Sequence, residues 1–378
     1  MFKKLISKLT SLFKREAVDA SYARMFVYAL PADYGDSILV QFVGNDERNH
    51  YIWVDGGLGR SYEQHGKAIL SAIAKQEEHV DLMVVSHVDQ DHIGGILAMA
   101  SDPEAPHDFI EQYWFNASRN LAQHFDTRHH PDREVPLPRV GLRSIDQGMK
   151  LESFLQKQGR WHTKPVMGFR YDHLHGLDVL VLGPTEAALE ALAHRWEDEM
   201  NEDSQERSIS FDKKKPHIKL EELAALPFKE DQSKANASSI VLALEYEGYR
   251  VLLPGDAHPS DLERSILALG YSKQRPMVLD AFKLSHHGSK KSLSPSLLDI
   301  IDCRHYIVST DASRYGLPNR EALARVVMHP RNHKRGTHIH FNYDNEILRG
   351  LFSEEELKTH NIELHFPTNP QLGAVLNF

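Results

Sequence analysis

The sequence has little cysteine, no long apolar run and no excess of basic charge, and each shortage excludes a class of protein. The single cysteine among 378 residues, Cys303, rules out an intramolecular disulfide framework and fits a reducing compartment. No run of about 18 apolar residues occurs, so no helix is expected to span a membrane. The net charge of −9 argues against a broad basic nucleic-acid surface, although it is compatible with a local basic groove. These shortages predict a cytoplasmic protein, with Cys303 as a buried structural thiol beside Ile300 and Ile301.

What is present indicates a globular protein in which metal chemistry is plausible. Apolar residues make up 41% of the chain and charged residues 26%, as in an ordinary soluble protein with a sizeable core. The length of 378 residues is compatible with one large domain or two, and no internal repeat is visible at a fixed period. The 24 histidines favour metal binding, although many are scattered and typical of solvated positions.

The first 20 residues predict a basic amphipathic helix that is separate from the rest of the chain. Within residues 1–16, apolar side chains recur at helical spacing on one face, with lysine and arginine on the flanks. Such a helix suits an anionic membrane surface or a groove on a protein partner. Packing on its own domain or on a second subunit is equally compatible, so a peripheral membrane location is one expectation among several.

Residues 24–378 are expected to form one domain with two additions. Residues 201–236 are charged and poor in apolar side chains, and they lie between predicted strands of one core, which indicates an insertion or lid. A solvated excursion without a role explains this stretch equally well. A further hypothesis is that the insertion occludes the site until a partner or protease removes it. From about residue 313 the chain is expected to be a C-terminal extension.

The densest cluster of possible metal ligands directly follows an apolar run. His87, Asp89, Asp91 and His92 occupy six positions between a predicted buried strand and a glycine pair that begins a helix. Imidazoles and carboxylates are the usual ligands of zinc, manganese and iron, and alternate residues at a strand end project the same way. Four such groups at this spacing favour a metal site over ordinary capping or surface roles.

Three other predicted strands end in the same way, with a histidine or aspartate and a glycine nearby. Tyr51–Val54 precedes Asp55, Tyr249–Leu253 precedes Asp256, and Val278–Leu284 precedes His286 and His287. Ligands on the ends of several strands predict a single metal site at one rim of a sheet structure.

Taken in order, these motifs resemble the metallo-β-lactamase superfamily. The matching segments are Asp55–Gly57, Ser86–Gly95, Leu253–Asp256 and Lys283–Ser289, and the resemblance covers roughly residues 24–312. It implies an α/β fold, α+β in some schemes, in which four layers form an αββα sandwich. It also implies a two-metal site at one rim of the two sheets.

Within that superfamily the chain looks most like the ComEC branch, the nuclease-like domain of the bacterial competence DNA-uptake channel. That branch also has aspartate at the second ligand position, here Asp89, and a His-His-Gly-Ser motif, here His286–Ser289. The segment Tyr315–Pro318 resembles its Tyr-Gly-His-Pro, with Leu317 in the place of the histidine. The resemblance implies a bacterial, free-standing relative, because no channel-forming membrane segments are present.

The resemblance assigns the first ligands residue by residue. One metal would be held by His87 and Asp89 and the second by Asp91 and His92. Asp256 would bridge the two metals. All five lie in segments that match the superfamily motifs.

The last ligand and the layer behind the ligands follow from the same resemblance. One histidine of the His286/His287 pair completes the second site, and His287 is favoured because small residues follow it directly. Asp55 and Ser289 are expected to orient ligands without binding metal themselves.

The ligand set has one gap and one unusual member. A histidine that many relatives supply midway along the chain has no clear counterpart; His173 and His175 lie near the expected place, and neither is favoured. The carboxylate of Asp89 makes the first site harder and richer in oxygen, which moves the metal preference from zinc towards manganese or magnesium. Two divalent ions are expected, manganese or zinc first and magnesium as an option.

Basic side chains are needed beside this site because its carboxylates lower the charge available to bind a phosphodiester. Lys283, Lys290 and Lys291 flank the last ligand, and Arg331–Arg335 forms another basic cluster. Plain solvation explains Lys290 and Lys291 equally well. Lys283 is harder to dismiss, because it lies on an apolar strand next to the site.

The ligand set predicts two-metal hydrolysis, with a metal-bridging hydroxide as the nucleophile. Asp91 is expected to hold or accept the proton of the water, and His286 or Lys283 to stabilise the leaving oxygen. The resemblance implies a phosphodiesterase or nuclease with nucleic acid, DNA or RNA, as its substrate.

Two alternatives remain open from the sequence. The fold serves many substrates, so hydrolysis of a small ester, lactone, amide or phosphodiester is the competing enzyme hypothesis. A regulatory or interaction protein with a weakly active site would instead use the N-terminal helix and the charged insertion to dock a protein partner.

Overall fold

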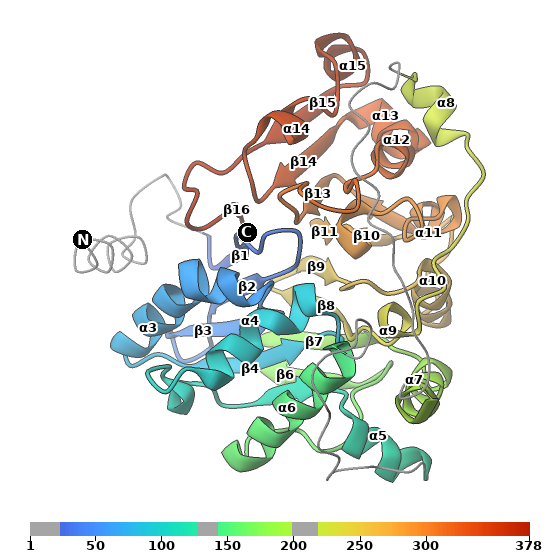
Figure 1. The fold of residues 1–378 in the computed structure, drawn as a ribbon. Coiled ribbons are helices and arrows are strands. Elements are labelled where there is room, and N and C mark those ends of the chain that lie inside the picture. Colours follow the sequence, from blue (N-terminus) through green and yellow to red (C-terminus); the bar gives the residue numbers. More distant parts are fainter. Residues whose placement is uncertain (1–22, 127–142, 199–217) are drawn as a thin grey trace.

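The computed structural model describes residues 23–126, 143–198 and 218–378 (Figure 1). The predicted N-terminal helix over residues 1–20 lies outside these ranges, as does the part of the 201–236 insertion that ends at residue 217. Within the described ranges, no helix is long and apolar enough to cross a membrane.

Two sheets form the centre of the fold (Figure 1). The six-stranded sheet has the order β16 (Ala374–Asn377), β1 (Met25–Ala29), β2 (Ile38–Val43), β3 (Asn49–Val54), β4 (Val80–Val85) and β5 (Tyr113–Phe115). The eight-stranded sheet has the order β15 (Ile362–His365), β14 (Thr337–Phe341), β13 (His305–Val308), β11 (Ala281–Lys283), β9 (Tyr249–Leu253), β8 (Val241–Tyr246), β7 (Leu177–Gly183) and β6 (Tyr171–Leu174). A separate parallel pair joins β10 (Met277–Leu279) to β12 (Ile301–Cys303).

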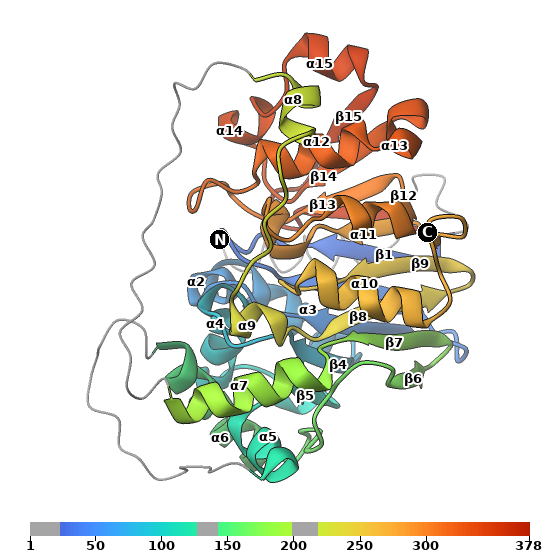
Figure 2. The ribbon, with the colours of Figure 1, turned by 90° about the vertical axis from the view of Figure 1, so that its right-hand side faces the viewer.

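Helices cover the outer face of each sheet (Figures 1 and 2). The six-stranded sheet is covered by α3 (Lys67–Lys75), α4 (Gln90–Ser101), α5 (Ser118–Phe125), α6 (Arg143–Gln158) and α7 (Glu186–Asp198). The eight-stranded sheet is covered by α8 (Leu220–Ala224), α10 (Pro259–Ala268), α11 (Pro295–Ile300), α12 (Arg320–Met328) and α13 (Pro330–Arg335). The predicted four-layer αββα sandwich is therefore confirmed.

Shorter helices connect these layers. They are α2 (Gly59–Ser61), η1 (Tyr62–Gly66), η2 (His107–Phe109), α9 (Lys234–Ala237), η3 (Ser285–Gly288), α14 (Glu346–Arg349) and α15 (Glu354–Thr359). Two of them matter for the site, because α9 and η3 both lie at the rim where the strand ends meet.

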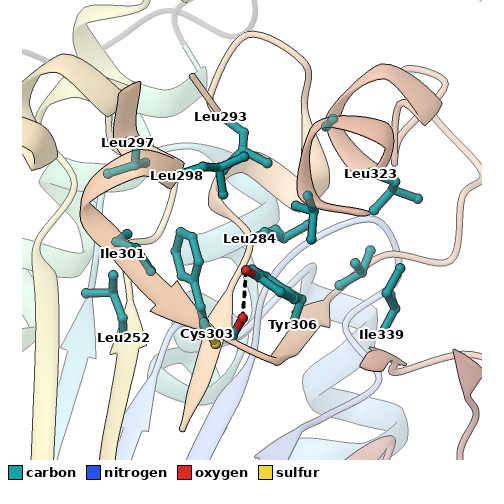
Figure 3. Close-up of a cluster of buried hydrophobic side chains, with 14 of the residues drawn as sticks. Leu252, Leu284, Leu293, Leu297, Leu298, Ile301, Cys303, Tyr306, Leu323 and Ile339 are labelled. Carbon is teal, nitrogen blue, oxygen red and sulfur yellow. Dashed lines mark hydrogen bonds between the residues drawn. The ribbon is translucent and has the colours of Figure 1, made fainter. Parts of the chain in front are cut away.

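Three hydrophobic clusters fill the three interfaces between the layers. In β1, Val27 points into the cluster between the sheets, whereas its neighbour Tyr28 points towards the helices. This alternation gives each central strand two apolar faces, which a sheet covered on both sides requires. Figure 3 shows part of the cluster under α11 and α12, where Tyr306 Oη donates to Cys303 O at 3.1 Å. Burial raises the pKa of the Cys303 thiol to about 12, and the predicted buried structural thiol is confirmed.

One predicted strand is wrong in its extent. The segment Val278–Leu284 is divided between β10 and β11, which belong to different sheets. The break falls at Asp280, whose N donates to Arg250 O at 2.8 Å and whose Oδ2 accepts from Arg250 N at 2.7 Å. These two hydrogen bonds replace regular strand pairing at Asp280. After this residue the chain passes from the β10–β12 pair into the eight-stranded sheet.

The residues after position 313 build parts of both sheets. β14 and β15 extend the eight-stranded sheet, and β16 pairs antiparallel with β1 at the edge of the six-stranded sheet. The described part of the insertion is also packed, because α8 contacts α12 and its Leu220 and Leu223 are buried.

Candidate metal centre

The predicted ligand segments meet at one rim of the sandwich, where β3, β4, β9 and β11 end. The turn after β3 packs directly on the start of α4, since Gly56 N donates to His92 O and Gly95 N donates to Gly57 O, each at 2.8 Å. A Cβ on Gly95 would lie 2.0 Å from Gly56 O, so only glycine permits this approach. The glycine pair after the ligand motif is thus what brings Asp55 against the ligands on α4.

The first group of ligand atoms comes from His87, Asp89 and Asp256. His87 Nε2 lies 3.5 Å from Asp89 Oδ2 and 3.9 Å from Asp256 Oδ2. Behind the ring, the hydroxyls of Ser86 and Ser239 lie 3.0 and 3.3 Å from His87 Nδ1 and fix the orientation of the imidazole. The structure therefore brings together the residues that were predicted to hold one metal.

The second group comes from Asp91, His92 and His287. Asp91 Oδ2 lies 3.4 Å from His287 Nε2, and His92 Nε2 lies 3.3 Å from Asp256 Oδ1. Asp256 thus presents one carboxylate oxygen to His87 and the other to His92. This position between the two groups is the one predicted for a bridging ligand.

The donor atoms of this rim fit divalent metal ions. Among the described residues, four buried side-chain atoms of the two groups make no hydrogen bond; they are His87 Nε2, His92 Nε2, His287 Nε2 and Asp256 Oδ1. A buried polar atom without a partner costs about 1–3 kcal/mol, so four of them around one space would be strongly unfavourable. Metal ions bound by their lone pairs would satisfy all four.

The negative charge of the rim also favours the binding of cations. Within the described residues, the ligand atoms and the groups directly behind them include five carboxylates and one ammonium, which leaves four negative charges uncompensated; they are Asp36, Asp55, Asp89, Asp91, Asp256 and Lys283. Burial alone would lower the pKa of His287, but Asp36 and Asp256 outweigh it and raise that pKa to about 9. In His92 the carboxylates of Asp256 and Asp55 likewise outweigh burial and raise the pKa well above its ordinary value. Without metal, the rim therefore favours protonation of His92 and His287.

Asp55 lies behind the second group, where its carboxylate accepts three hydrogen bonds. The donors are Ser86 N at 2.7 Å, Ser86 Oγ at 2.6 Å and His92 Nδ1 at 2.8 Å. A carboxylate on Nδ1 selects the tautomer that leaves the lone pair of Nε2 free for a metal.

Asp36 is a member of the site that sequence reasoning missed. It follows β1 in the turn before β2, and its Oδ1 lies 3.2 Å from His287 Nδ1. Burial alone would raise the pKa of Asp36, but Lys283 and then His287 outweigh it and hold the pKa below its ordinary value. The available signal was an aspartate directly after a glycine in the turn between two buried strands, and Asp256 also follows a glycine.

Lys283 lies behind the ligands and does not face the mouth of the site. Its ammonium contacts the carboxylate of Asp36 and donates to Gly255 O at 3.2 Å, and its side chain is 1% exposed. Asp256 Oδ1 also lies 3.9 Å from the Nζ atom, and all of these neighbours are buried with it, so the structure favours a supporting role for Lys283 over the expected role of stabilising a leaving oxygen. Its position instead fixes Asp36 and the turn that carries Asp256.

His286 and His287 have backbone angles that separate their rings. Both residues have positive φ, of 50° and 54°, and their rings are inclined at 78°. His287 Nδ1 lies 3.0 Å from Ser309 O, which leaves Nε2 to face the second group. His286 Nε2 lies 3.8 Å from Asp256 Oδ2, and its Nδ1 lies 3.3 Å from Asn236 Nδ2 on α9. Both imidazoles therefore approach the bridging carboxylate, and His286 does so from the more exposed side.

Ser289 closes the turn that presents these two histidines. Its N donates to His286 O at 2.9 Å, and its Oγ accepts from Lys291 N at 3.3 Å. The next residue, Lys290, is half exposed and pairs with Glu321 at 2.9 Å. The positive charge of Lys290 is thus partly neutralised by Glu321.

The basic cluster Arg331–Arg335 lies at the other end of β13 from the rim. Arg335 Nη2 donates to Cys303 O at 2.7 Å, just before β13 begins, whereas the rim histidine contacts Ser309 just after it ends. Arg331 Nη2 donates to three carbonyls at and after the end of α11. The expectation that this cluster adds charge to the site is wrong, because its guanidinium groups support the helix layer.

His173 and His175 also lie elsewhere. His173 Nδ1 lies 2.6 Å from Asp178 Oδ1 on the antiparallel pair of β6 and β7. The ring of His175 stacks on that of His50 with 3.7 Å between centroids. Neither supplies the missing histidine, in agreement with the sequence analysis, which favoured neither.

Comparisons with known proteins give distant structural similarity. No family model and no curated protein sequence matches this chain. The metallo-β-lactamase fold protein YhfI from Bacillus subtilis is 8% identical over 94% of this chain and 100% of its own, with a TM-score of 0.37. A metallo-β-lactamase from Cronobacter sakazakii is 13% identical over 69% of this chain and 75% of its own, with a TM-score of 0.32. CmlA, a diiron β-hydroxylase from Streptomyces venezuelae, is 11% identical over 99% of this chain and 59% of its own, with a TM-score of 0.42. Identities and scores this low assign neither family nor activity, so the function is inferred from the side chains of the rim.

Proposed function

We propose that this protein is a metal-dependent hydrolase that cleaves phosphodiesters of nucleic acid, in the manner implied by its resemblance to the ComEC branch. The observation that carries the proposal is the pair of ligand groups that share Asp256, with their unpaired atoms facing one space. His87, Asp89 and Asp256 would hold one divalent ion, and Asp91, His92, His287 and Asp256 the other. When bound, two such ions supply a hydroxide at neutral pH and stabilise the charge that develops on phosphoryl oxygens.

The residues of the rim have distinct roles in this proposal. Asp91 lies at the edge of the second group, with its side chain 18% exposed, so it can accept the proton of an attacking water. His286 is the more exposed of the paired histidines and is placed to donate a hydrogen bond to the leaving oxygen. Lys283 has an indirect role in this proposal. Its ion pair with Asp36 and its hydrogen bond to Gly255 O keep the ring of His287 and the turn that carries Asp256 in position.

An aromatic and basic group beside Asp91 favours a nucleotide substrate. Tyr34 lies in the turn before Asp36, and Asp36 N donates to Asp91 O at 3.0 Å, which ties this turn to the site. The guanidinium of Arg314 lies 4.9 Å from the centroid of the Tyr34 ring, and Tyr315 contacts the same ring edge-on at 5.8 Å. Tyr315 is 40% exposed, so its ring can stack on a base, and Arg314 can pair with a phosphate.

Charge favours a second candidate, hydrolysis of a small phosphodiester. The net charge is −9, and Lys290 beside the site is paired with Glu321. A long nucleic acid needs several phosphate contacts along its path, whereas a small diester needs only the rim. Both candidates use the same residues and the same two metals.

The deciding experiment measures metal content and cleavage together. Protein reconstituted with Mn²⁺, Zn²⁺ or Mg²⁺ would be tested on single- and double-stranded DNA, on RNA and on bis(p-nitrophenyl) phosphate. Cleavage is expected only with metal and should be lost in Asp91→Ala, while the matched control His173→Ala, altered outside the site, keeps full activity. Cleavage of the small diester alone would select the second candidate. Two bound metal equivalents without cleavage of any phosphodiester would disprove both.

A further inference from the structure

A group of histidines lies on the inward face of β13, β14 and β15, beyond the hydrophobic cluster that fills the space between the two sheets in the described part of the chain. The cluster between the two sheets includes Ile307 of β13 but no residue of β14 or β15, although both strands belong to the sheet. Ile339 and Phe341 point to the outer helices, so the alternate residues of β14 point inward. These alternate residues are His338 and His340, and β14 and β15 continue the sheet at the top of Figure 1.

Strand register places five polar side chains side by side on this inward face. His305 pairs with His338, His338 with Glu363, and His340 with His365, all in parallel register. The rings stack in two pairs, His305 on His338 at 4.5 Å and His340 on His365 at 4.4 Å between centroids. A hollow of about 500 Å³, whose walls include His305 and His340, opens beside them.

Three ligand atoms of this group converge with spacings that suit one metal ion. His338 Nδ1 lies 3.1 Å from His365 Nε2 and 3.2 Å from Glu363 Oε2, and His365 Nε2 lies 3.9 Å from Glu363 Oε2. Tetrahedral zinc with bonds of about 2.0–2.1 Å requires ligand atoms about 3.4 Å apart, close to the mean of these distances. A proton on one nitrogen can be shared with only one acceptor, whereas a cation can bind all three atoms at once.

We propose that His338, Glu363 and His365 form a second metal site that binds one Zn²⁺ ion and leaves its fourth coordination position open. Two imidazoles and a carboxylate are a typical ligand set for zinc at a site with one open coordination position. His305 and His340 stack on the two ligand rings and hold them in place. The site is separate from the rim, because His305 begins β13 and the rim contact at Ser309 follows its end, about 13 Å along the strand.

The test counts zinc in the whole protein and in variants of the histidine face. The native chain and the double variant His338→Ala/His365→Ala would be saturated with Zn²⁺, dialysed and analysed for zinc by mass spectrometry. We expect the double variant to bind one equivalent less, with unchanged hydrolytic activity. This difference is expected whether or not the rim binds metal, so it separates this proposal from the proposed function. Equal zinc content in both proteins would overturn the proposal.

Two further variants test whether a loss of zinc reflects misfolding or nonspecific binding. Glu363→Gln changes a side chain that is 58% exposed, so it should fold normally, and it should weaken Zn²⁺ binding at this site at least tenfold in a competition titration with a chromophoric chelator. His173→Ala removes a histidine outside the group whose side chain is 52% exposed, similar to Glu363, and it should leave zinc binding unchanged. Unaltered affinity in Glu363→Gln, or the same loss in His173→Ala, would contradict a specific site.

Discussion

Replacing Lys283 with methionine removes a buried ammonium that partly balances the carboxylates of the rim. The side chains of Lys283 and Asp36 are 1% and 2% exposed, so the carboxylate would stay buried after its partner has gone. Removing one member of a buried ion pair costs about 3–5 kcal/mol, most of it from the charge left unpaired. Because His287 Nδ1 remains 3.2 Å from Asp36, we expect the lower end, a loss of about 3 kcal/mol in the free energy of unfolding.

Urea unfolding of metal-depleted protein measures this loss, and a second substitution tests its cause. Lys283→Met/Asp36→Asn leaves no unpaired charge, so its unfolding free energy should return to within about 1–2 kcal/mol of the native value. Lys290→Met is the matched control, because its pair with Glu321 is half exposed and should cost less than about 1 kcal/mol. A loss below about 1 kcal/mol in Lys283→Met, or a double variant as unstable as the sum of the single variants, would refute the reasoning.

The same pair predicts a dependence on pH with a definite sign. Lys283 and His287 hold the pKa of Asp36 below its ordinary value of 3.8, so its contribution to stability is complete above that pH. The contribution is lost as the pH falls through the lower pKa of the folded state. The difference in unfolding free energy between native and Lys283→Met should therefore shrink in acid, and a difference that grows below pH 3.8 would contradict the pairing.

Three further changes test the ligand orientation, the packing of the rim and a titrating group away from it. Asp55→Asn weakens the acceptor of His92 Nδ1 and should lower metal affinity about 10–100-fold in a chelator competition, with unchanged affinity refuting that role. Gly95→Ala would place a Cβ 2.0 Å from a backbone oxygen and should cost at least about 1–3 kcal/mol in urea unfolding, whereas Gly59→Ala, with its nearest atom at 3.6 Å, should be tolerated. Burial alone would lower the pKa of His50, but two hydrogen-bonded carboxylates raise it above 6.5, so its stabilisation is present below pH 6.5 and is lost as the pH rises through the folded pKa. The urea midpoint of the native protein should fall over that range relative to His50→Gln, and parallel curves would exclude the effect.

The meeting of the candidate ligands at the rim could be predicted because each one belongs to a local pattern. A strand ends directly before or close to Asp55, His87 and Asp256, and glycines lie nearby in the sequence. Such a pattern places a side chain at the end of a strand. Since the ends of neighbouring strands meet at one edge of a sheet, these side chains are expected to lie close together. The choice of His287 over His286 rested on the resemblance, in which small residues follow the last ligand, and in the structure His287 Nε2 lies 3.4 Å from Asp91 Oδ2 and 3.8 Å from Asp256 Oδ2.

What the sequence could not predict depends on partners that are distant along the chain. Asp36 is an ordinary turn residue until Lys283 lies against it. Asp280 divides the predicted strand Val278–Leu284 because its carboxylate accepts a hydrogen bond from the backbone N of Arg250. The histidines of β14 and β15 look scattered in sequence, and they gather on one face only once the order of the strands is known.

Charge links the chemistry of the rim to its stability. Four uncompensated negative charges surround the ligand atoms, and protonating His92 and His287 supplies only two positive charges. Two divalent cations would balance the rim completely and leave both imidazoles neutral, as metal ligands must be. Since a cation that binds only the folded state stabilises it by about 2.7 kcal/mol at 100 times its dissociation constant, metal loading should raise the free energy of unfolding of the protein. An aspartate at position 89 then has a second consequence besides its hardness, because a histidine there would make the rim one charge more positive with the same pair of cations.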